Sequence, residues 1–203
     1  NKCHGPIAVM AGELVGTDQS KLSPQSADAI ACDFCHQVSG SKKPGNGSYE
    51  MTFNGNKRAQ LSDAKSPAHG TEYNKLFETA EFCGMCHNVD HPINGMHLES
   101  TYSEWKKSPY AKEGVTCQDC HMTPGAGVTK PNAGQAAAMG PNREHIYTMT
   151  WAGGNNALGP KDLAEQNLRA AAKVTLEAPE IVAAGEKVAA KTIIENVGAG
   201  HYL

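Results

Sequence analysis

Apolar residues recur in short stretches along this chain, and the spacing within each stretch predicts a local element. Apolar side chains share one helical face over Thr71–Glu81 and over Leu98–Lys107. A third helix is predicted over Asp162–Lys173, shortly after a Gly-Pro pair. The tail then changes character, because Val174–Ala178 and Lys187–Val197 are rich in Val, Ile and Thr and predict two strands. Strands need partners, so we expect a small β unit completed by residues beyond the last one or by another chain.

Between these elements the chain is rich in residues that punctuate secondary structure. Ser23-Pro24, Ser66-Pro67 and Ser108-Pro109 each combine an N-cap residue with Pro at the first helical position, which predicts three helix starts. Ser39–Gly47 and Pro124–Gly140 are rich in Gly, Pro, Ser, Asn and Ala and predict loops. The expected fold is mainly helical and irregular, with few short helices, long loops and a small β element at the C-terminal end.

The composition is that of a chain with little protein core of its own. Of 203 residues 39% are hydrophobic, whereas Gly (21) and Pro (11) are plentiful. Without a cofactor, such a chain would resemble a loosely folded one. The formal net charge of −3 gives no indication of nucleic-acid binding. No stretch approaches the roughly 18 apolar residues of a membrane span, so we expect no span.

Three copies of Cys-x-x-Cys-His change this picture. They occupy Cys32–His36, Cys83–His87 and Cys117–His121, and Asn1–His4 matches the last four residues of a fourth copy, whose first Cys we expect just before Asn1. This pattern attaches haem covalently: the two thiols add across its vinyl groups, and the His coordinates the iron from one side. Cys-x-x-Cys pairs also build zinc ribbons, and a single pair can be a redox dithiol. Neither of these needs a His directly after the second Cys.

Haem attachment accounts for all seven cysteines and for four of the nine histidines. The predicted attachment residues are Cys3, Cys32, Cys35, Cys83, Cys86, Cys117 and Cys120. The predicted proximal iron ligands are His4, His36, His87 and His121. No thiol is left for a disulfide or a catalytic nucleophile.

Four haems c, three of them from intact motifs, would leave roughly 50 residues per haem, too few for separate protein cores. The porphyrins would then form much of the core, and we expect the haem-free chain not to fold. We expect a tetrahaem domain over residues 1–155, followed over 156–203 by a linker helix and the start of a β-rich segment. Because haem is attached outside the cytoplasm, we expect the protein to be periplasmic or extracellular.

Five histidines remain for the second axial position, one more than four bis-His haems require. They are His69, His91, His97, His145 and His201. His69 follows a predicted helix start, and the small residues before His201 allow the backbone to come close to a porphyrin. His91 and His97 compete, since both lie just after the same attachment motif. Each candidate could instead hydrogen-bond to a haem propionate or to the backbone.

The surplus permits one His to bind a haem of a neighbouring subunit. Methionine is the rival axial ligand, and Met122 and Met149 are among seven methionines. A Met/His iron has a higher potential than a bis-His iron. The supply of His makes low-potential bis-His haems the expected state, with most Met packed against haem edges.

The residues around the motifs also carry a family resemblance. The matching stretches are Cys32–His36, Phe82–His87, Glu104–Ala111, Cys117–Met122, Trp151–Asn155 and Gly198–Leu203. They resemble multihaem cytochromes c related to the nitrifier tetrahaem cytochrome and to hydroxylamine oxidoreductase. The resemblance implies haems stacked in parallel and perpendicular pairs, in a family of electron carriers, enzymes and filament-forming extracellular cytochromes. Relatives would have a second His near Met149, where this chain has none.

The sequence therefore predicts electron transfer through closely spaced six-coordinate haems, with redox proteins as partners and no reaction at a capped iron. The alternative is a multihaem enzyme or enzyme fragment, in which a haem without its distal ligand converts a small nitrogen or sulfur compound. The surplus His and the unpaired strands also suggest self-association into a polymer with continuous haems.

Overall fold

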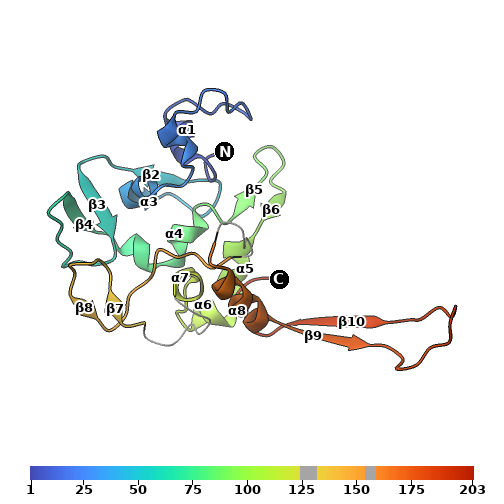
Figure 1. Ribbon diagram of the computed structural model, residues 1–203. Helices are drawn as coiled ribbons and strands as arrows, with labels where there is room; N and C mark the ends of the chain where they lie inside the picture. Colours follow the sequence, from blue (N-terminus) through green and yellow to red (C-terminus); the bar gives the residue numbers. More distant parts are fainter. Residues whose placement is uncertain (124–131, 154–158) are drawn as a thin grey trace. The chain divides into compact units, whose positions relative to one another are not determined.

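The chain forms two compact units, Asn1–Ser103 and Glu104–Leu203. The structure is a computed structural model that describes residues 1–123, 132–153 and 159–203, and Figure 1 shows short elements joined by long connections in each unit. The domain boundary predicted at residues 155/156 falls in 154–158, outside the described residues. Within the described ranges, no helix is both long enough and apolar enough to cross a membrane.

The first unit contains short helices and three two-stranded sheets. Its helices are α1 (Pro6–Met10), α2 (Pro24–Ala27), α3 (Cys32–Gln37), the 3-10 helix η1 (Lys75–Glu78) and α4 (Ala80–Gly84). Its strands are β1 (Val38–Ser41), β2 (Tyr49–Met51), β3 (Asn56–Ala59), β4 (Gly70–Tyr73), β5 (Val89–Asp90) and β6 (His97–Glu99). The β1–β2 and β5–β6 pairs are antiparallel, whereas β3 and β4 pair in parallel. Helix α5 (Thr101–Lys107) leads from this unit into the second.

The second unit likewise contains helices and two-stranded sheets. Its helices are α6 (Pro109–Lys112), α7 (Cys117–His121) and α8 (Lys161–Ala171). Its strands are β7 (Gly134–Gln135), β8 (Asn142–Arg143), β9 (Ala172–Glu177) and β10 (Lys191–Asn196). Both pairs, β7–β8 and β9–β10, are antiparallel.

A small apolar cluster forms the core of the first unit. Phe34, Val38 and Met85 are buried together. The partly buried side chains packed against them are Ile7, Cys35, Tyr49, Met51, Leu76, Phe82 and Cys86. The Phe34 and Tyr49 rings meet edge to face with centres 4.8 Å apart, a favourable arrangement for aromatic pairs. Two predicted attachment cysteines therefore belong to this core.

Two of the three predicted Ser-Pro helix starts are confirmed. Ser23 caps α2 by accepting a hydrogen bond from the Ser26 N–H, and Ser108 caps α6 in the same way through Ala111. The third prediction, at Ser66-Pro67, is wrong, because the described chain has no helix there. The Ser66 hydroxyl accepts the Ala68 N–H in a local turn instead.

The single helix predicted over Thr71–Glu81 is wrong in its first residues and interrupted in the rest. Its first residues form strand β4, which pairs with β3. The next residues form η1, whose cap Asn74 accepts the Leu76 N–H, and the extended backbone of Thr79 separates η1 from α4. Long-range pairing with β3 thus overrides the helical spacing of the apolar residues.

The helix predicted over Leu98–Lys107 is right from Thr101 onward, whereas Leu98 lies in strand β6. The loop predicted over Ser39–Gly47 is partly wrong, because β1 extends into it as far as Ser41. Of the loop predicted over Pro124–Gly140, residues 124–131 lie outside the described residues, and the short strand β7 lies in the rest.

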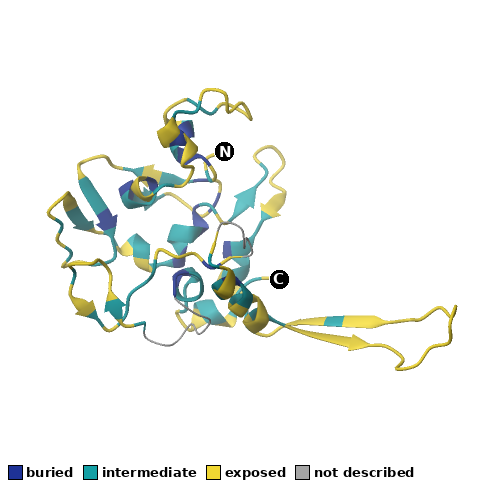
Figure 2. Cartoon of the chain, in the orientation of Figure 1, coloured by how far each residue is buried: buried dark blue, intermediate teal, exposed yellow. Residues whose placement is uncertain are grey.

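The helix and the two strands predicted for the tail are confirmed, but the expectation that these strands need residues beyond the last one or another chain as partners is wrong, because β9 and β10 pair with each other. Helix α8 begins and ends within two residues of its predicted bounds, and β9 and β10 are the two predicted strands. These strands form a ribbon that extends away from α8 (Figure 1), and nearly all of it is exposed (Figure 2).

The ribbon has two different faces. Val174 and Leu176 of β9 alternate with charged or polar residues, and Ile194 of β10 lies opposite Val174, so these three apolar side chains share one face. All three are exposed. The other face carries two cross-strand ion pairs, Lys173–Glu195 at 3.8 Å and Lys191–Glu177 at 3.5 Å.

Gly84, inside the second intact motif, is expected not to tolerate a side chain. A Cβ there would lie 2.5 Å from Cδ2 of the buried Tyr102, whose hydroxyl donates to Glu81. We expect Gly84→Ala to lower the free energy of unfolding by about 1–3 kcal/mol, the usual cost of overpacking. Urea denaturation of the haem-containing protein measures this. Gly153→Ala is the matched control, since a Cβ at Gly153 meets none of the described residues within 4 Å. Equal effects of the two changes would contradict the packing argument.

Candidate functional site

The intact motifs lie on short helices. The first occupies α3, the second begins at the end of α4, and the third occupies α7. Because residues three apart share one helical face, the spacing presents both thiols of a motif on the same side. In α7 a capping box fixes the helix start: Thr116 and Asp119 exchange hydrogen bonds, and the Thr116 N–H donates to Asp119 Oδ2 at 2.6 Å.

Predicted attachment cysteines from three different motifs meet in the first unit. The Cys3 thiol donates to the carbonyl of Cys86 over 3.9 Å, and Cys35 and Cys86 pack against the same core residues. Burial raises the pKa of the Cys86 thiol to about 12, and the neighbouring Cys3 and then Cys35 thiols contribute. Burial, followed by the nearby Cys32 thiol, also raises the pKa of Cys35. Groups attached at these sulfurs would therefore begin within a few side chains of one another.

His36 is oriented as a metal-binding histidine usually is. Its Nδ1 donates to the carbonyl of Arg58 at 2.7 Å, which leaves Nε2 as the unprotonated nitrogen available to iron. The Phe77 ring lies nearly parallel to the His36 ring, with centres 6.1 Å apart and planes 17° apart. A phenyl ring has no atom that coordinates iron, so this pair supplies one axial ligand.

His121 is held in the same way in the second unit. Its Nδ1 donates to the carbonyl of Ala152 at 2.6 Å, and the Ala152 N–H donates back to the His121 carbonyl at 3.0 Å. Ala152 is buried. Burial also raises the pKa of the neighbouring Cys120 thiol to about 11, with the Asp119 carboxylate as the next cause.

His201 is placed by a small-residue segment that rests on two aromatic side chains. A Cβ at Gly200 would lie 3.3 Å from Tyr110 and 3.4 Å from Trp105, so Gly allows this close approach. The Tyr110 hydroxyl donates to the Gly198 carbonyl at 3.1 Å, and the Asn196 amide donates to the His201 carbonyl at 2.8 Å. The small residues before His201 thus bring the backbone close to Trp105 and Tyr110, whereas the sequence predicted a close approach to a porphyrin, which stays a prediction.

His121 and His201 face each other in the second unit as a pair. Their ring centres are 6.3 Å apart and their planes differ by 14°. Since an imidazole nitrogen binds a metal at about 2 Å, two imidazoles on opposite sides of one metal have centres roughly 6 Å apart. The Nδ1 of His201 contacts the Tyr202 carbonyl at 2.8 Å, so both rings have Nε2 left for the metal. The separation of the two rings is therefore that of two axial imidazoles on one iron.

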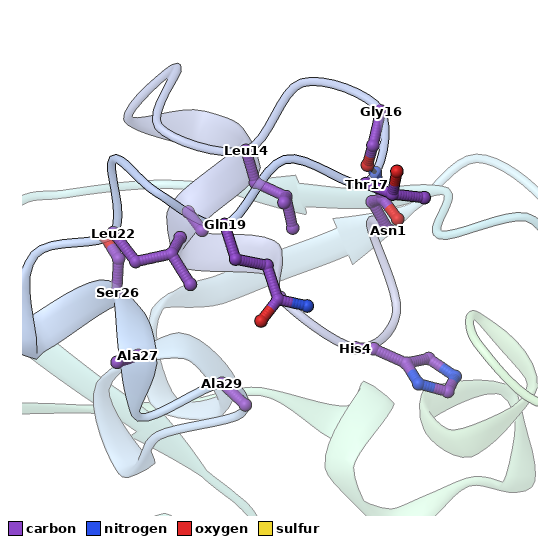
Figure 3. A pocket seen from close by; sticks show the side chains of 12 residues that line it. Asn1, His4, Leu14, Gly16, Thr17, Gln19, Leu22, Ser26, Ala27 and Ala29 are labelled. Carbon is purple, nitrogen blue, oxygen red and sulfur yellow. Dashed lines mark hydrogen bonds between the residues drawn. The ribbon is translucent and has the colours of Figure 1, made fainter.

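His4 lines a pocket of about 500 Å³ in the first unit. Its apolar wall includes Leu14 and Leu22, and Gln19 and Ser26 add polar atoms. Figure 3 shows the His4 imidazole at one end of this pocket, pointing away from Leu14 and Leu22. The size is within the usual range for small-molecule and cofactor sites, so the partial motif lies beside a cofactor-sized space.

The remaining proximal candidate, His87, is exposed, with Nδ1 3.8 Å from Glu99 Oε1. The nearby β5–β6 hairpin carries the two competing distal candidates. His97 Nδ1 contacts Asp90 Oδ1 at 2.6 Å, a typical partner of a metal-bound imidazole. His91 is the more buried of the two, but its Nδ1 accepts the Ile93 N–H at 3.3 Å. Hydrogen bonding therefore favours His97, and burial favours His91.

His69 and His145 differ in their surroundings. His69 is exposed at the start of β4, with Nδ1 2.9 Å from the Gly70 carbonyl. His145 is more enclosed: its ring meets Tyr147 edge to face, and its Nε2 is buried without a hydrogen-bond partner among the described residues. A buried unpaired nitrogen fits an iron ligand. The Nδ1 of His145 accepts the Asn132 N–H at 3.0 Å, a bond that iron coordination would have to replace.

The two methionines considered as axial ligands differ in burial. Met122, next to His121, is buried, and its carbonyl accepts the Thr148 N–H at 2.7 Å. Met149 is exposed. Met122 is therefore placed for packing in the second unit.

The sequence pattern missed the groups that hold the proximal rings. Arg58 and Ala152 act through backbone carbonyls, and a backbone carbonyl leaves no signature in a sequence. Glu72 pairs with Arg58, and its pKa is lowered. Hydrogen bonds from the Asn56 amide and then from Arg58 hold this pKa below the ordinary value of a glutamate.

A structural zinc site needs four clustered ligands, and within the described ranges no three or more His, Cys, Asp or Glu side chains are grouped to hold a metal ion. Comparison of the chain with protein-family models, with curated proteins and with solved structures gave no match.

Proposed function

We propose that this protein is an exported multihaem c-type cytochrome that transfers electrons. The observation that carries the proposal is the meeting of Cys3, Cys35 and Cys86, from three separate motifs, around one small core. Electron transfer between cofactors weakens steeply with distance, so attachment points that share a core favour fast transfer. The paired imidazoles of His121 and His201 support the same function, because two strong axial ligands leave no open position for a substrate.

The chain's own residues would hold and orient the cofactors. Each Cys pair would fix a porphyrin edge through two thioether bonds, and His36 and His121 would present Nε2 to iron while backbone carbonyls hold Nδ1. When bound, haem c supplies one-electron chemistry, its iron alternating between ferric and ferrous states. The proposed partners are a donor and an acceptor protein. Self-association, with one surplus His binding a haem of a neighbouring subunit, is part of the same proposal.

Mass spectrometry and absorption spectroscopy of the purified protein test this function. We expect covalent haem on the six cysteines of the intact motifs and a spectrum dominated by low-spin iron. The double change Cys117→Ser/Cys120→Ser is expected to remove the mass of one haem and the matching share of absorbance, because no other thiol can replace these two. Unmodified thiols, or zinc bound in place of haem, would refute the proposal.

One observation favours the enzymatic alternative at a single position. The ring that stacks on His121 is an imidazole, that of His201, whereas the ring that stacks on His36 is the phenyl ring of Phe77. A haem attached at Cys32 and Cys35 could therefore keep one axial position open. The alternative function is conversion of a small nitrogen or sulfur compound there. It requires a substantial high-spin signal together with turnover of nitrite or hydroxylamine. A fully low-spin protein without turnover would eliminate it.

A further inference from the structure

Arg58 is buried, and a buried arginine normally requires a partner for its charge. It is 1% exposed. Its guanidinium makes five hydrogen bonds, as many as it has N–H groups. The acceptors are Glu72 Oε1 (3.1 Å) and Oε2 (2.9 Å), the carbonyls of Thr52 (2.9 Å) and Gln37 (3.4 Å), and Asn54 Oδ1 (3.2 Å). The side chain is therefore fixed in one position.

Both ends of Arg58 reach the C-terminal end of α3. Its carbonyl accepts the His36 Nδ1–H at 2.7 Å, and its guanidinium donates to the carbonyl of Gln37, the next residue along the chain. Arg58 thus contacts the His36 ring through its carbonyl and the backbone of the following residue through its guanidinium.

Glu72, on the neighbouring strand β4, is the charged partner of Arg58. It lies directly opposite Arg58 in the parallel β3–β4 ladder, and its carboxylate receives the guanidinium through two hydrogen bonds, a geometry that lysine cannot reproduce. The Glu72 side chain is 40% exposed, so the negative charge sits between the buried cation and solvent.

We propose that the Arg58–Glu72 pair is a positioning element for the haem attached at Cys32 and Cys35, fixing the plane of the His36 ring and balancing the positive charge beside it. This inference rests on the proposed function. A buried positive charge near a haem stabilises the reduced state, so the potential of this haem depends on how completely Glu72 offsets Arg58.

Glu72→Gln tests the charge. It keeps the shape of the side chain and removes the negative charge. We expect spectroelectrochemical titration of the haem-containing protein to show one haem shifted to higher potential and the others unchanged. Glu50→Gln is the matched control, because Glu50 is similarly exposed (48%) and is paired only loosely, with Lys42 Nζ at 3.8 Å. The conservative change Glu72→Asp is expected to restore most of the original potential.

Arg58→Lys tests the positioning while keeping the charge. We expect the ferric EPR signal of one haem to change, because the g-values of a haem iron depend on the orientation of the imidazole that binds it. An unchanged EPR spectrum would remove the positioning role. If Glu72→Gln does not fold, this second variant still decides that part.

The outcomes separate this inference from the proposed function. If Glu72→Gln shifts the haem potentials no more than Glu50→Gln does, with all haems in place, the charge balance is refuted. The proposed electron transfer is unaffected by that result. A wild-type protein without covalent haem would overturn both.

Discussion

The chain made without covalent haem is expected to show no cooperative unfolding transition. In the described part of the chain nine hydrophobic residues are buried, and four of them are alanines, so little apolar surface is removed from water by protein alone. The longest helix that the structure describes, α8, has 11 residues, and isolated helices of this length are marginal in water. The entropy cost of ordering the chain would exceed these gains.

The measurement is urea denaturation followed by far-ultraviolet circular dichroism, on protein made with and without the haem-attachment machinery. We expect a sigmoidal transition for the haem-containing form and a gradual slope, with a free energy of unfolding near or below zero, for the bare chain. The matched control is the haem-containing protein with its iron reduced, which keeps the covalent bonds. A cooperative transition of similar midpoint in the bare chain would show that the protein core suffices.

His201→Ala is expected to convert one haem from low spin to high spin. The pairing of His121 and His201 at 6.3 Å predicts that both bind the iron of the haem attached at Cys117 and Cys120. Loss of one imidazole leaves five ligands, and the weaker field favours the high-spin state. EPR of the oxidised protein is the measurement, and we expect a new high-spin signal that accounts for one haem.

Tyr202→Phe is the control for this change. Tyr202 is exposed, and it contacts His201 through its backbone carbonyl, which the substitution keeps. We expect the control to remain low-spin and added imidazole to return His201→Ala to low spin. A variant that stays low-spin without imidazole would mean that another residue binds this iron.

Local signals in the sequence predicted local structure well. Ser23 and Ser108 cap helices as expected, because an N-cap followed by Pro depends only on neighbouring residues. The strands of the tail were predictable for the same reason, since Val, Ile and Thr favour extended backbone. The motif residues themselves were also evident, since their spacing is written in five consecutive positions.

Structure that depends on distant partners was not predictable. The Thr71–Glu81 segment has helical spacing, yet its first residues pair with β3, and the Arg58–Glu72 contact spans that ladder. The position of His201 next to His121 likewise depends on distant residues, because Trp105 and Tyr110 contact the Gly198–Gly200 segment. The sequence offered five histidines as candidates for the distal position, and these packing contacts place one of them, His201, next to His121.

The ribbon of β9 and β10 has a consequence for the proposed haem site. Asn196, the last residue of β10, holds both the His201 carbonyl and the Ala199 N–H. Force applied to the exposed ribbon would therefore act, through Asn196, close to the imidazole that we propose as an axial ligand. Immobilising the protein through this ribbon, for example on an electrode, would disturb its voltammetry, and attachment through another surface would preserve the native signal.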